Sequence, residues 1–499
     1  MHDILLAFGL VFEPYTMAVI LVSALFGLFV GAVPGLTATM ATALLVPVTF
    51  FMPPVPAIAS IVTATAMAIF SGDIPGCLMR IPGTPASAAY TDEAYAMTKK
   101  GLAETALGAG LVFSVIGGLF GTVVLVTSAP ALAEVAVRFS SFEYFWLVLL
   151  GLTCAVFIST GNPLKGIVSL LAGLLISAIG LDNPAGYPRF TFGSIELLGS
   201  VGLIPMMIGM FAVSEILRYT VETSGAGELV TRQIGNVFRG QWGLTKKYWA
   251  SILRGSALGT LIGALPGAGA DIAAWMSYAM SKKFSKEPEK FGTGHVEGIV
   301  ESGAANNSAL AGAWIPALVF GIPGDSITAI VIGVLYIKGM NPGPAIFMNN
   351  PSQIYAVFLV FFLANLLMIP LGWACIKAAK RILDVPRNLL MPVILLFCIV
   401  GAFAINNTVF AVAIILVFGV IAYFMEENGF PIAPAILGVI LGTMLEENFI
   451  TSMIKSDGRF IAFFERPIAA TLGIATLLVW AWPIARYWVR PRPTAPQAH

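Results

Sequence analysis

Long apolar runs fill most of this chain, and polar residues are confined to short stretches between them. Each run is close to the length of about 20 residues that a helix needs to cross a bilayer core. The clearest runs are 108–129, 142–159, 164–180, 354–376, 389–404, 408–424 and 467–485. They are apolar on every side, whereas the strands of a membrane barrel alternate apolar and polar positions. The pattern predicts an all-α polytopic membrane protein with about 10–12 transmembrane helices and additional broken or re-entrant helices.

A motif that breaks a helix occurs twice within apolar sequence. Residues 27–35 read GLFVGAVPG and residues 259–267 read GTLIGALPG, an offset of 232 residues. A second pair follows at an offset of 241, because Ile81-Pro82-Gly83 is matched by Ile322-Pro323-Gly324. Proline removes a backbone donor and glycine adopts conformations that other residues avoid, so each motif predicts a helix break. Two motifs in one order at nearly one offset predict an internal duplication.

The positive charges around the two Pro-Gly motifs differ. The first motif has no Lys or Arg on either flank, whereas the second is flanked by Arg254, Lys282, Lys283, Lys286 and Lys290. Positive residues accumulate on the cytoplasmic side of membrane proteins. The two elements are therefore expected to enter the membrane from opposite faces, which makes the duplication an inverted repeat of the kind found in transporters. A parallel repeat is the alternative.

These features divide the chain into four parts. We expect a first membrane repeat at 1–217, a polar cytoplasmic linker at 218–250, a second membrane repeat at 251–455, and an extra helix with a basic cytoplasmic tail at 456–499. Residues 4–12 form either a short interfacial helix or the start of the first span. Arg490 and Arg492 in the tail place the C-terminus in the cytoplasm.

Composition excludes several functions. Only 11% of residues are charged and 58% are hydrophobic, and the net charge of +1 gives no sign of nucleic-acid binding. The four cysteines, which lie far apart in apolar sequence, are expected to be small core residues. The three histidines form no metal-protease motif, and no serine or aspartate arrangement fits an intramembrane protease. We expect no enzyme activity and no cofactor.

The breaks are also the candidate binding site. A helix that begins inside the membrane presents unpaired N–H groups and partial positive charge, which suit a carboxylate. Broken helices at matching positions of two halves indicate a transporter site; the alternative is that they are kinks that let helices pack. The candidate substrate-binding residues are Pro34, Gly35, Thr37, Thr39, Arg80, Gly83, Thr84, Ser87, Pro266, Gly267, Gly269, Asn306, Asn307, Gly324 and Ser326.

Charged residues in membrane segments are costly and usually functional. Each charged residue near the breaks has two possible roles. Arg80 either clamps a carboxylate or pairs with Asp73. Asp73, Asp271 and Asp325 are candidate cation sites, and the last two are alternatively helix caps. The neighbouring Asn306 and Asn307 suit a carboxylate or a sodium ion, or link helices by hydrogen bonds. A passive anion channel remains the alternative to a carrier.

Taken together, the motifs resemble the large membrane subunit of the tripartite tricarboxylate transporters, the TctA type, over nearly the whole chain. The resemblance rests on 27–39, 81–85, 164–167, 189–193, 263–269, 301–307 and 430–438. It implies a secondary transporter of the bacterial inner membrane that imports a di- or tricarboxylate with Na⁺ or H⁺. It also implies two partners, a small membrane subunit of the TctB type and a periplasmic solute-binding protein of the TctC type.

The resemblance supports three pairs of the candidate residues as site residues: Pro34-Gly35, Pro266-Gly267 and Asn306-Asn307. The chain departs from the family pattern around the first Ile-Pro-Gly. It has Asp73 and Arg80 where the family has a serine-rich stretch and an asparagine. This departure points to a carboxylate other than citrate.

Overall fold

The computed structural model describes residues 2–158, 162–181, 186–221, 235–383 and 387–489, and helices dominate this part of the chain. Seven of its helical segments are long and apolar enough to cross a membrane. They are α2 (Pro14–Ala32), α4 with α5 (Pro54–Met79), α7 (Ala103–Ala136), the segment Leu203–Val221 that contains α10 and α11, α18 (Pro351–Leu383), α20 (Val409–Glu427) and α21 (Ile432–Lys455). This confirms the all-α polytopic fold. The exact number of crossings stays a prediction.

Shorter apolar helices accompany these spans. They are α1 (His2–Val11), α3 (Ala38–Phe50), α8 (Ser141–Ile158), α9 (Pro163–Ser177), α16 (Ser326–Ile337), α19 (Arg387–Asn406) and α22 (Pro467–Val489). The other helices used below are α6 (Ala88–Lys99), α12 (Gln241–Lys247), α13 (Trp249–Gly263), α14 (Gly269–Phe284) and α15 (Val296–Phe320). Since α1 ends before Pro14 starts α2, residues 4–12 belong to a separate helix and not to the first span.

Both Pro-Gly motifs break a helix, as predicted. The first break separates α2 from α3 and the second separates α13 from α14. Gly35 and Gly267 adopt φ values of +89° and +81°, in the left-handed region that glycine tolerates best. Thr37 caps α3 by accepting a hydrogen bond from the Met40 N–H at 3.1 Å.

The two halves make the same helix contacts. A Cβ on Gly31 would lie 2.2 Å from the carbonyl oxygen of Ala68, and a Cβ on Gly263 would lie 2.2 Å from that of Ala309. One turn earlier the same close packing is made by Gly27 with Ala64 and by Gly259 with Ala305. Small residues let membrane helices approach this closely. The pair α2–α4 is therefore matched by the pair α13–α15.

Helices of each half also pack against helices of the other half. From the first half, α7 packs along α15 of the second, and α18 of the second half packs on α4 of the first. In the same way α3 contacts α16, and α6 contacts α14. Reciprocal contacts of this kind are what a two-fold relation produces. They support two structural repeats, whereas the inverted orientation and the boundaries at 217 and 251 stay predictions. Residues 222–234 of the expected linker and 490–499 of the expected tail lie outside the described residues.

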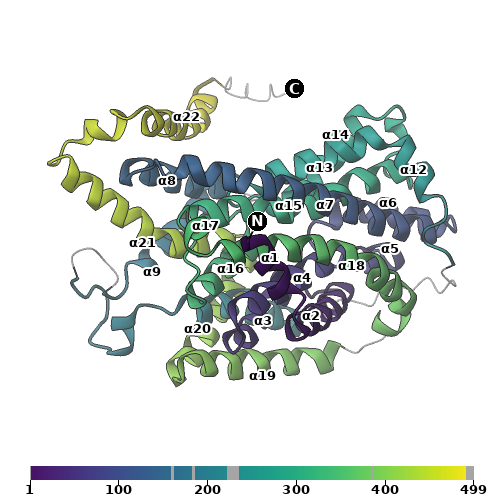
Figure 1. The fold of residues 1–499 in the computed structure, drawn as a ribbon, viewed down its shortest axis with the longest axis horizontal. Coiled ribbons are helices and arrows are strands. Elements are labelled where there is room, and N and C mark those ends of the chain that lie inside the picture. The colour runs from purple at the N-terminus through teal and green to yellow at the C-terminus, as the bar shows by residue number, and fades with distance from the viewer. Residues whose placement is uncertain (1, 159–161, 182–185, 222–234, 384–386, 490–499) are drawn as a thin grey trace, which may run out of the picture.

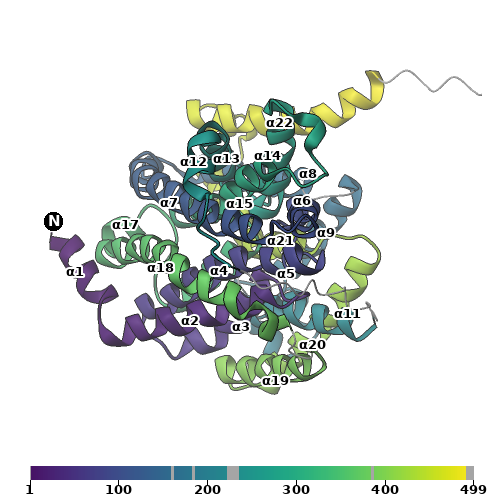
Figure 2. The same ribbon diagram turned by 90° about the vertical axis from the view of Figure 1, so that its right-hand side faces the viewer.

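The additional C-terminal helix lies at one edge of the molecule. In both views α22 and α19 occupy opposite edges (Figures 1 and 2). Helix α22 packs on α8, and Trp480 Nε1 of α22 donates a hydrogen bond to Thr153 Oγ1 of α8 at 2.9 Å. All four cysteines are free. The prediction of small core residues is confirmed for Cys77, Cys375 and Cys398, which are buried, whereas Cys154 is half-buried.

Candidate functional site

Each Ile-Pro-Gly motif is followed by the same hydrogen-bonded turn. The backbone N–H groups and side-chain hydroxyls of Thr84 and Ser87 bond one another reciprocally, both at 3.1 Å. At the equivalent positions Asp325 and Thr328 form a capping box, with bonds of 2.9 and 2.8 Å. Such boxes satisfy backbone donors at a helix start. For Asp325 the helix-cap alternative is therefore confirmed, and half-buried Ser326 begins α16.

The glycine of each Ile-Pro-Gly turn packs on the helix that ends at the Pro-Gly break of its own half. A Cβ on Gly83 would lie 2.6 Å from the Gly31 carbonyl oxygen, and a Cβ on Gly324 would lie 2.5 Å from that of Gly263. Turn and break are therefore adjacent in both halves. Of the predicted site residues, Gly83 thus lies beside the helix that leads into Pro34-Gly35, and Gly324 lies beside the helix that leads into Pro266-Gly267.

The two halves meet at the start of α14. Helix α14 contacts α6 of the first half, and its Asp271 carboxylate lies near the Ala86 backbone of the first Ile-Pro-Gly turn. Within the second half, a Cβ on Gly269 would lie 2.7 Å from Asp325 Cβ. Asp271 is not the N-cap of α14, which is Ala268 and makes no side-chain cap. Its side chain is exposed, so water reaches the carboxylate.

A buried polar triad lies between the halves as well. Asp73 begins α5, Tyr90 lies on α6 and Asn306 lies on α15. The Tyr90 hydroxyl donates to Asp73 Oδ1 at 2.6 Å, and Asn306 Nδ2 donates to the Tyr90 oxygen at 3.2 Å. Asp73 Oδ2 and Asn306 Oδ1 are buried without a hydrogen-bond partner. A buried polar atom without a partner is costly, so this triad is a candidate for ligand binding.

Helix α15 leaves open space near its two asparagines. Gly303 is buried, yet no heavy atom lies within 4 Å of the place where its Cβ would be. Asn306 and Asn307 follow three and four residues later and therefore lie on the same side of the helix. Asn307 Nδ2 contacts the sulfur of Met368 on α18 at 3.5 Å, and its Oδ1 is without a partner.

Arg80 has its side chain at the surface, just before the first Ile-Pro-Gly turn, and among the described residues it makes no hydrogen bond or ion pair with these groups. It is ion-paired with Asp92 at 2.8 Å, and the two side chains are 62% and 68% exposed. The prediction that it pairs with Asp73 is wrong, because α5 ends in a left-handed residue at Arg80 that leaves the side chain at the surface, while Asp73 bonds Tyr90 instead. The φ of Arg80 is +60°, at the position where the second half has Gly321 with φ +69°. A side chain is costly in that conformation, which suggests a functional reason for it.

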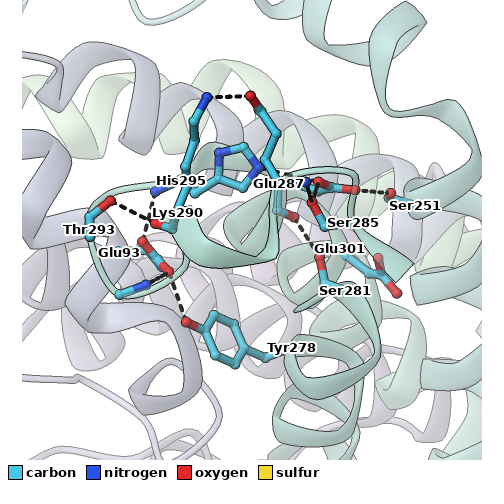
Figure 3. Close-up of polar contacts among 12 residues, drawn as sticks. Glu93, Ser251, Tyr278, Ser281, Ser285, Glu287, Lys290, Thr293, His295 and Glu301 are labelled. Atoms are coloured by element: carbon cyan, nitrogen blue, oxygen red, sulfur yellow. Dashed lines mark hydrogen bonds and ion pairs between the residues drawn. The ribbon is translucent and has the colours of Figure 1, made fainter. Parts of the chain in front are cut away.

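A carboxylate of the first half holds a turn of the second. Figure 3 shows Glu93 of α6 pointing into the turn that leads to α15. Its oxygens accept hydrogen bonds from Tyr278 Oη at 2.8 Å, from the N–H groups of Gly294 and His295 at 2.7 Å each, and from the Gly292 N–H. Beside it, Ser251 and Ser285 donate to Glu297. This interface involves none of the predicted site residues.

Sequence reasoning did not identify Tyr90, Gly303 or Glu93 as candidates. Tyr90 and Glu93 belong to a polar stretch between apolar runs, which was the available signal. Within the described part of the chain, no three His, Cys, Asp or Glu side chains come together as metal ligands. Whether the candidate residues contact substrate stays a prediction.

The capping role of Asp325 can be tested by stability. We expect Asp325→Ala to lower the free energy of unfolding by about 1 kcal/mol, because the Thr328 N–H loses its acceptor. Asp325→Asn keeps an acceptor and should stay within about 0.5 kcal/mol of the wild type. Thermal unfolding of the purified chain measures both. An equal loss in the two variants would show that charge, and not capping, is the contribution of Asp325.

These contacts define an all-α polytopic membrane protein with two matched broken-helix units that meet between its halves. The chain belongs to the tripartite tricarboxylate transporter TctA family, whose model matches residues 17–437. It is 32% identical over 484 residues to an Agrobacterium vitis protein described as an uncharacterized 52.8 kDa protein in the TAR-I ttuC' 3'region, covering 96% of each chain. A second A. vitis protein, from the TAR-II ttuC' 3'region, is 36% identical over 43% of this chain and 88% of its own length. No solved structure matches the chain.

Proposed function

We propose that this transporter subunit imports an organic di- or tricarboxylate across the bacterial inner membrane by symport with Na⁺ or H⁺. The observation that carries the proposal is the contact between halves at the breaks, where α14 packs on α6 and Asp271 of the second half lies near the Ala86 backbone of the first, beside Gly269 and Asp325. Substrate sites of alternating-access carriers lie between repeats, at the ends of discontinuous helices.

The electrostatics of this place support an anion that travels with a cation. The start of α14 has no side-chain cap, so its first-turn N–H groups are available to a carboxylate. Asp271 stands in the same turn and Asp325 is close to it. An anion bound here meets two carboxylates, and a bound Na⁺ or H⁺ offsets that repulsion.

The partners and the topology belong to the same proposal. Membership of a tripartite family implies other subunits. We propose a small membrane subunit of the TctB type and a periplasmic solute-binding protein of the TctC type that delivers the carboxylate. Lys282, Lys283, Lys286 and Lys290 are all exposed around the end of α14, which supports a cytoplasmic position for this face. The C-terminus is proposed to be cytoplasmic too.

The direct test is uptake of labelled di- and tricarboxylates into proteoliposomes that contain the chain, with and without the two proposed partners, under an imposed Na⁺ or H⁺ gradient. Accumulation that requires both the gradient and the binding protein supports the proposal. Downhill flux that ignores the gradient would replace it with a passive anion channel.

Arg80 allows a test of substrate contact with little effect on folding. We expect Arg80→Gly to reduce uptake about tenfold or more, because a charge-assisted hydrogen bond to the carboxylate is lost. Its stability should stay equal or rise, since glycine suits φ +60° and an exposed ion pair contributes little. Asp92→Ala breaks the same ion pair from the other side and is the matched control. Equal loss of uptake in both variants would assign the effect to the ion pair and remove Arg80 from the site.

A further inference from the structure

We propose that Asp73, Tyr90 and Asn306 form a sodium site between the two halves of the chain. The inference rests on the proposed function for the role of the ion in transport, but the site itself is argued from contacts alone. These three side chains are 7%, 2% and 0% exposed, so the polar groups they carry are removed from bulk water.

The atoms without partners are both acceptors. The Tyr90 hydroxyl donates a hydrogen bond to one oxygen of the Asp73 carboxylate and accepts one from the amide nitrogen of Asn306. The remaining oxygen of each group, Asp73 Oδ2 and Asn306 Oδ1, is buried and unpartnered. Both groups are anchored on the same hydroxyl, which brings the carboxylate and the amide close together. Two acceptors cannot bond each other, and a cation satisfies both at once.

The charge of the triad matches a monovalent ion. It holds one carboxylate, one amide and one hydroxyl, and the only hydrogen bond of Asp73 among the described side chains is the one from Tyr90. A buried carboxylate without a countercharge is costly in a membrane protein. Oxygen donors select hard cations, and a single negative charge is balanced by one positive charge, whereas calcium sites use several carboxylates.

Helix α7 passes close to the carboxylate. A Cβ on Gly110 would lie 3.0 Å from Asp73 Oδ2, so any side chain at this position would crowd that oxygen. Ser114 follows one turn later on the same side of α7, and its buried hydroxyl also has no partner. This hydroxyl is a further candidate oxygen ligand.

The two groups that the first half contributes, Asp73 and Tyr90, have no counterpart in the second half. The positions of the second half that match Asp73 and Tyr90 at the offset of 241 are Trp314 and Val331. An indole N–H is a donor and valine has no polar group, so neither can hold a cation. The repeat therefore predicts one such site per chain.

The test uses the purified full chain in detergent, with no carboxylate and no gradient. Its thermal unfolding is followed as NaCl replaces choline chloride or KCl at constant ionic strength. We expect sodium alone to raise Tm by about 2 °C or more, since a ligand that binds the native state stabilises it. Asp73→Asn should abolish the rise. Asn306→Ala and Gly110→Ala should each increase the half-saturating sodium concentration about tenfold or more.

Two variants control for general effects. Gly9→Ala adds a methyl group at an exposed helix position with no atom within 4 Å, and Glu143→Gln alters a buried carboxylate that Arg466 holds at 2.6 Å. Both should keep the wild-type sodium response. Gly110→Ala retains every polar group and therefore carries the test if Asp73→Asn fails to fold.

Equal stabilisation by potassium or choline, or stabilisation by acid without sodium, would overturn the proposal. An unchanged response in folded Asp73→Asn or Gly110→Ala would do the same. Failure of this site is distinguishable from failure of the proposed function. A sodium response without carboxylate uptake would support the sodium site but contradict the proposed symport. Sodium-driven uptake that persists in Asp73→Asn would contradict the sodium site but not the symport.

Discussion

A Gly263→Ala variant is expected to lose about 3 kcal/mol or more of its free energy of unfolding, and part of the protein should fail to fold. The added Cβ would lie 2.2 Å from the Ala309 carbonyl oxygen and 2.8 Å from its Cα. These are backbone atoms that cannot rotate away, so α13 and α15 would have to separate along their length. Thermal unfolding, with the fraction of monodisperse protein after extraction, measures the loss.

The duplication supplies a second site for the same prediction. Gly31→Ala should have a similar effect, because its Cβ would lie 2.2 Å from the Ala68 oxygen and 2.7 Å from the Ala68 Cα. Gly9→Ala is the matched control and should be neutral or slightly stabilising, since alanine favours a helix. Wild-type stability of Gly263→Ala would contradict the close approach of α13 to α15. A large loss at only one of the two positions would contradict the structural equivalence of the halves.

The helix breaks were predictable because their cause is local. Proline and glycine act on the backbone of their own segment, so Pro34-Gly35 and Pro266-Gly267 indicate breaks without knowledge of the rest of the chain. The duplication was predictable for a related reason, since motifs at a constant offset imply equivalent structures. The fold class followed from the length of the apolar runs, which depends on the thickness of the bilayer and not on tertiary contacts.

Contacts between segments distant in the sequence were not predictable in this way. Asp73 and Arg80 are close in the chain and opposite in charge, which made an ion pair a reasonable expectation. The left-handed turn at Arg80 and the hydroxyl of Tyr90 decide otherwise. The sequence likewise indicated that Gly267 permits a break, but not that a Cβ there would lie 2.5 Å from Ala155 Cα on α8. Substituting Gly267 therefore disturbs packing as well as the candidate site.

The same distinction applies to the polar residues. Asp325 could be recognised as a helix cap because its partner Thr328 is three residues away. The partners of Glu93 are about 200 residues away, in a turn whose position depends on α14 and α15. No spacing rule connects them. Their importance becomes visible only when the backbone donors of that turn are matched with acceptors.

Replacing Glu93 by alanine is expected to cost about 3–5 kcal/mol of unfolding free energy. The carboxylate is fully buried and accepts hydrogen bonds from three backbone N–H groups of the 292–295 turn and from Tyr278. Of these donors, the N–H of His295 is buried and would stay unpaired, because alanine carries no acceptor. Glu93→Gln should lie between alanine and the wild type, because it keeps one acceptor oxygen but turns an NH₂ group toward N–H donors.

Two measurements separate this effect from a general loss of stability. The first is Tm, which should fall in Glu93→Ala. The second is limited trypsin digestion, in which cleavage at Lys286 and Lys290 should accelerate, because the turn between α14 and α15 loses its attachment to α6. Glu287→Ala is the matched control in the same turn, since Glu287 pairs only with exposed Lys290, and it should leave Tm unchanged. Normal Tm and normal cleavage in Glu93→Ala would show that this carboxylate does not hold the two halves together, and the reciprocal helix contacts alone would then have to maintain their arrangement.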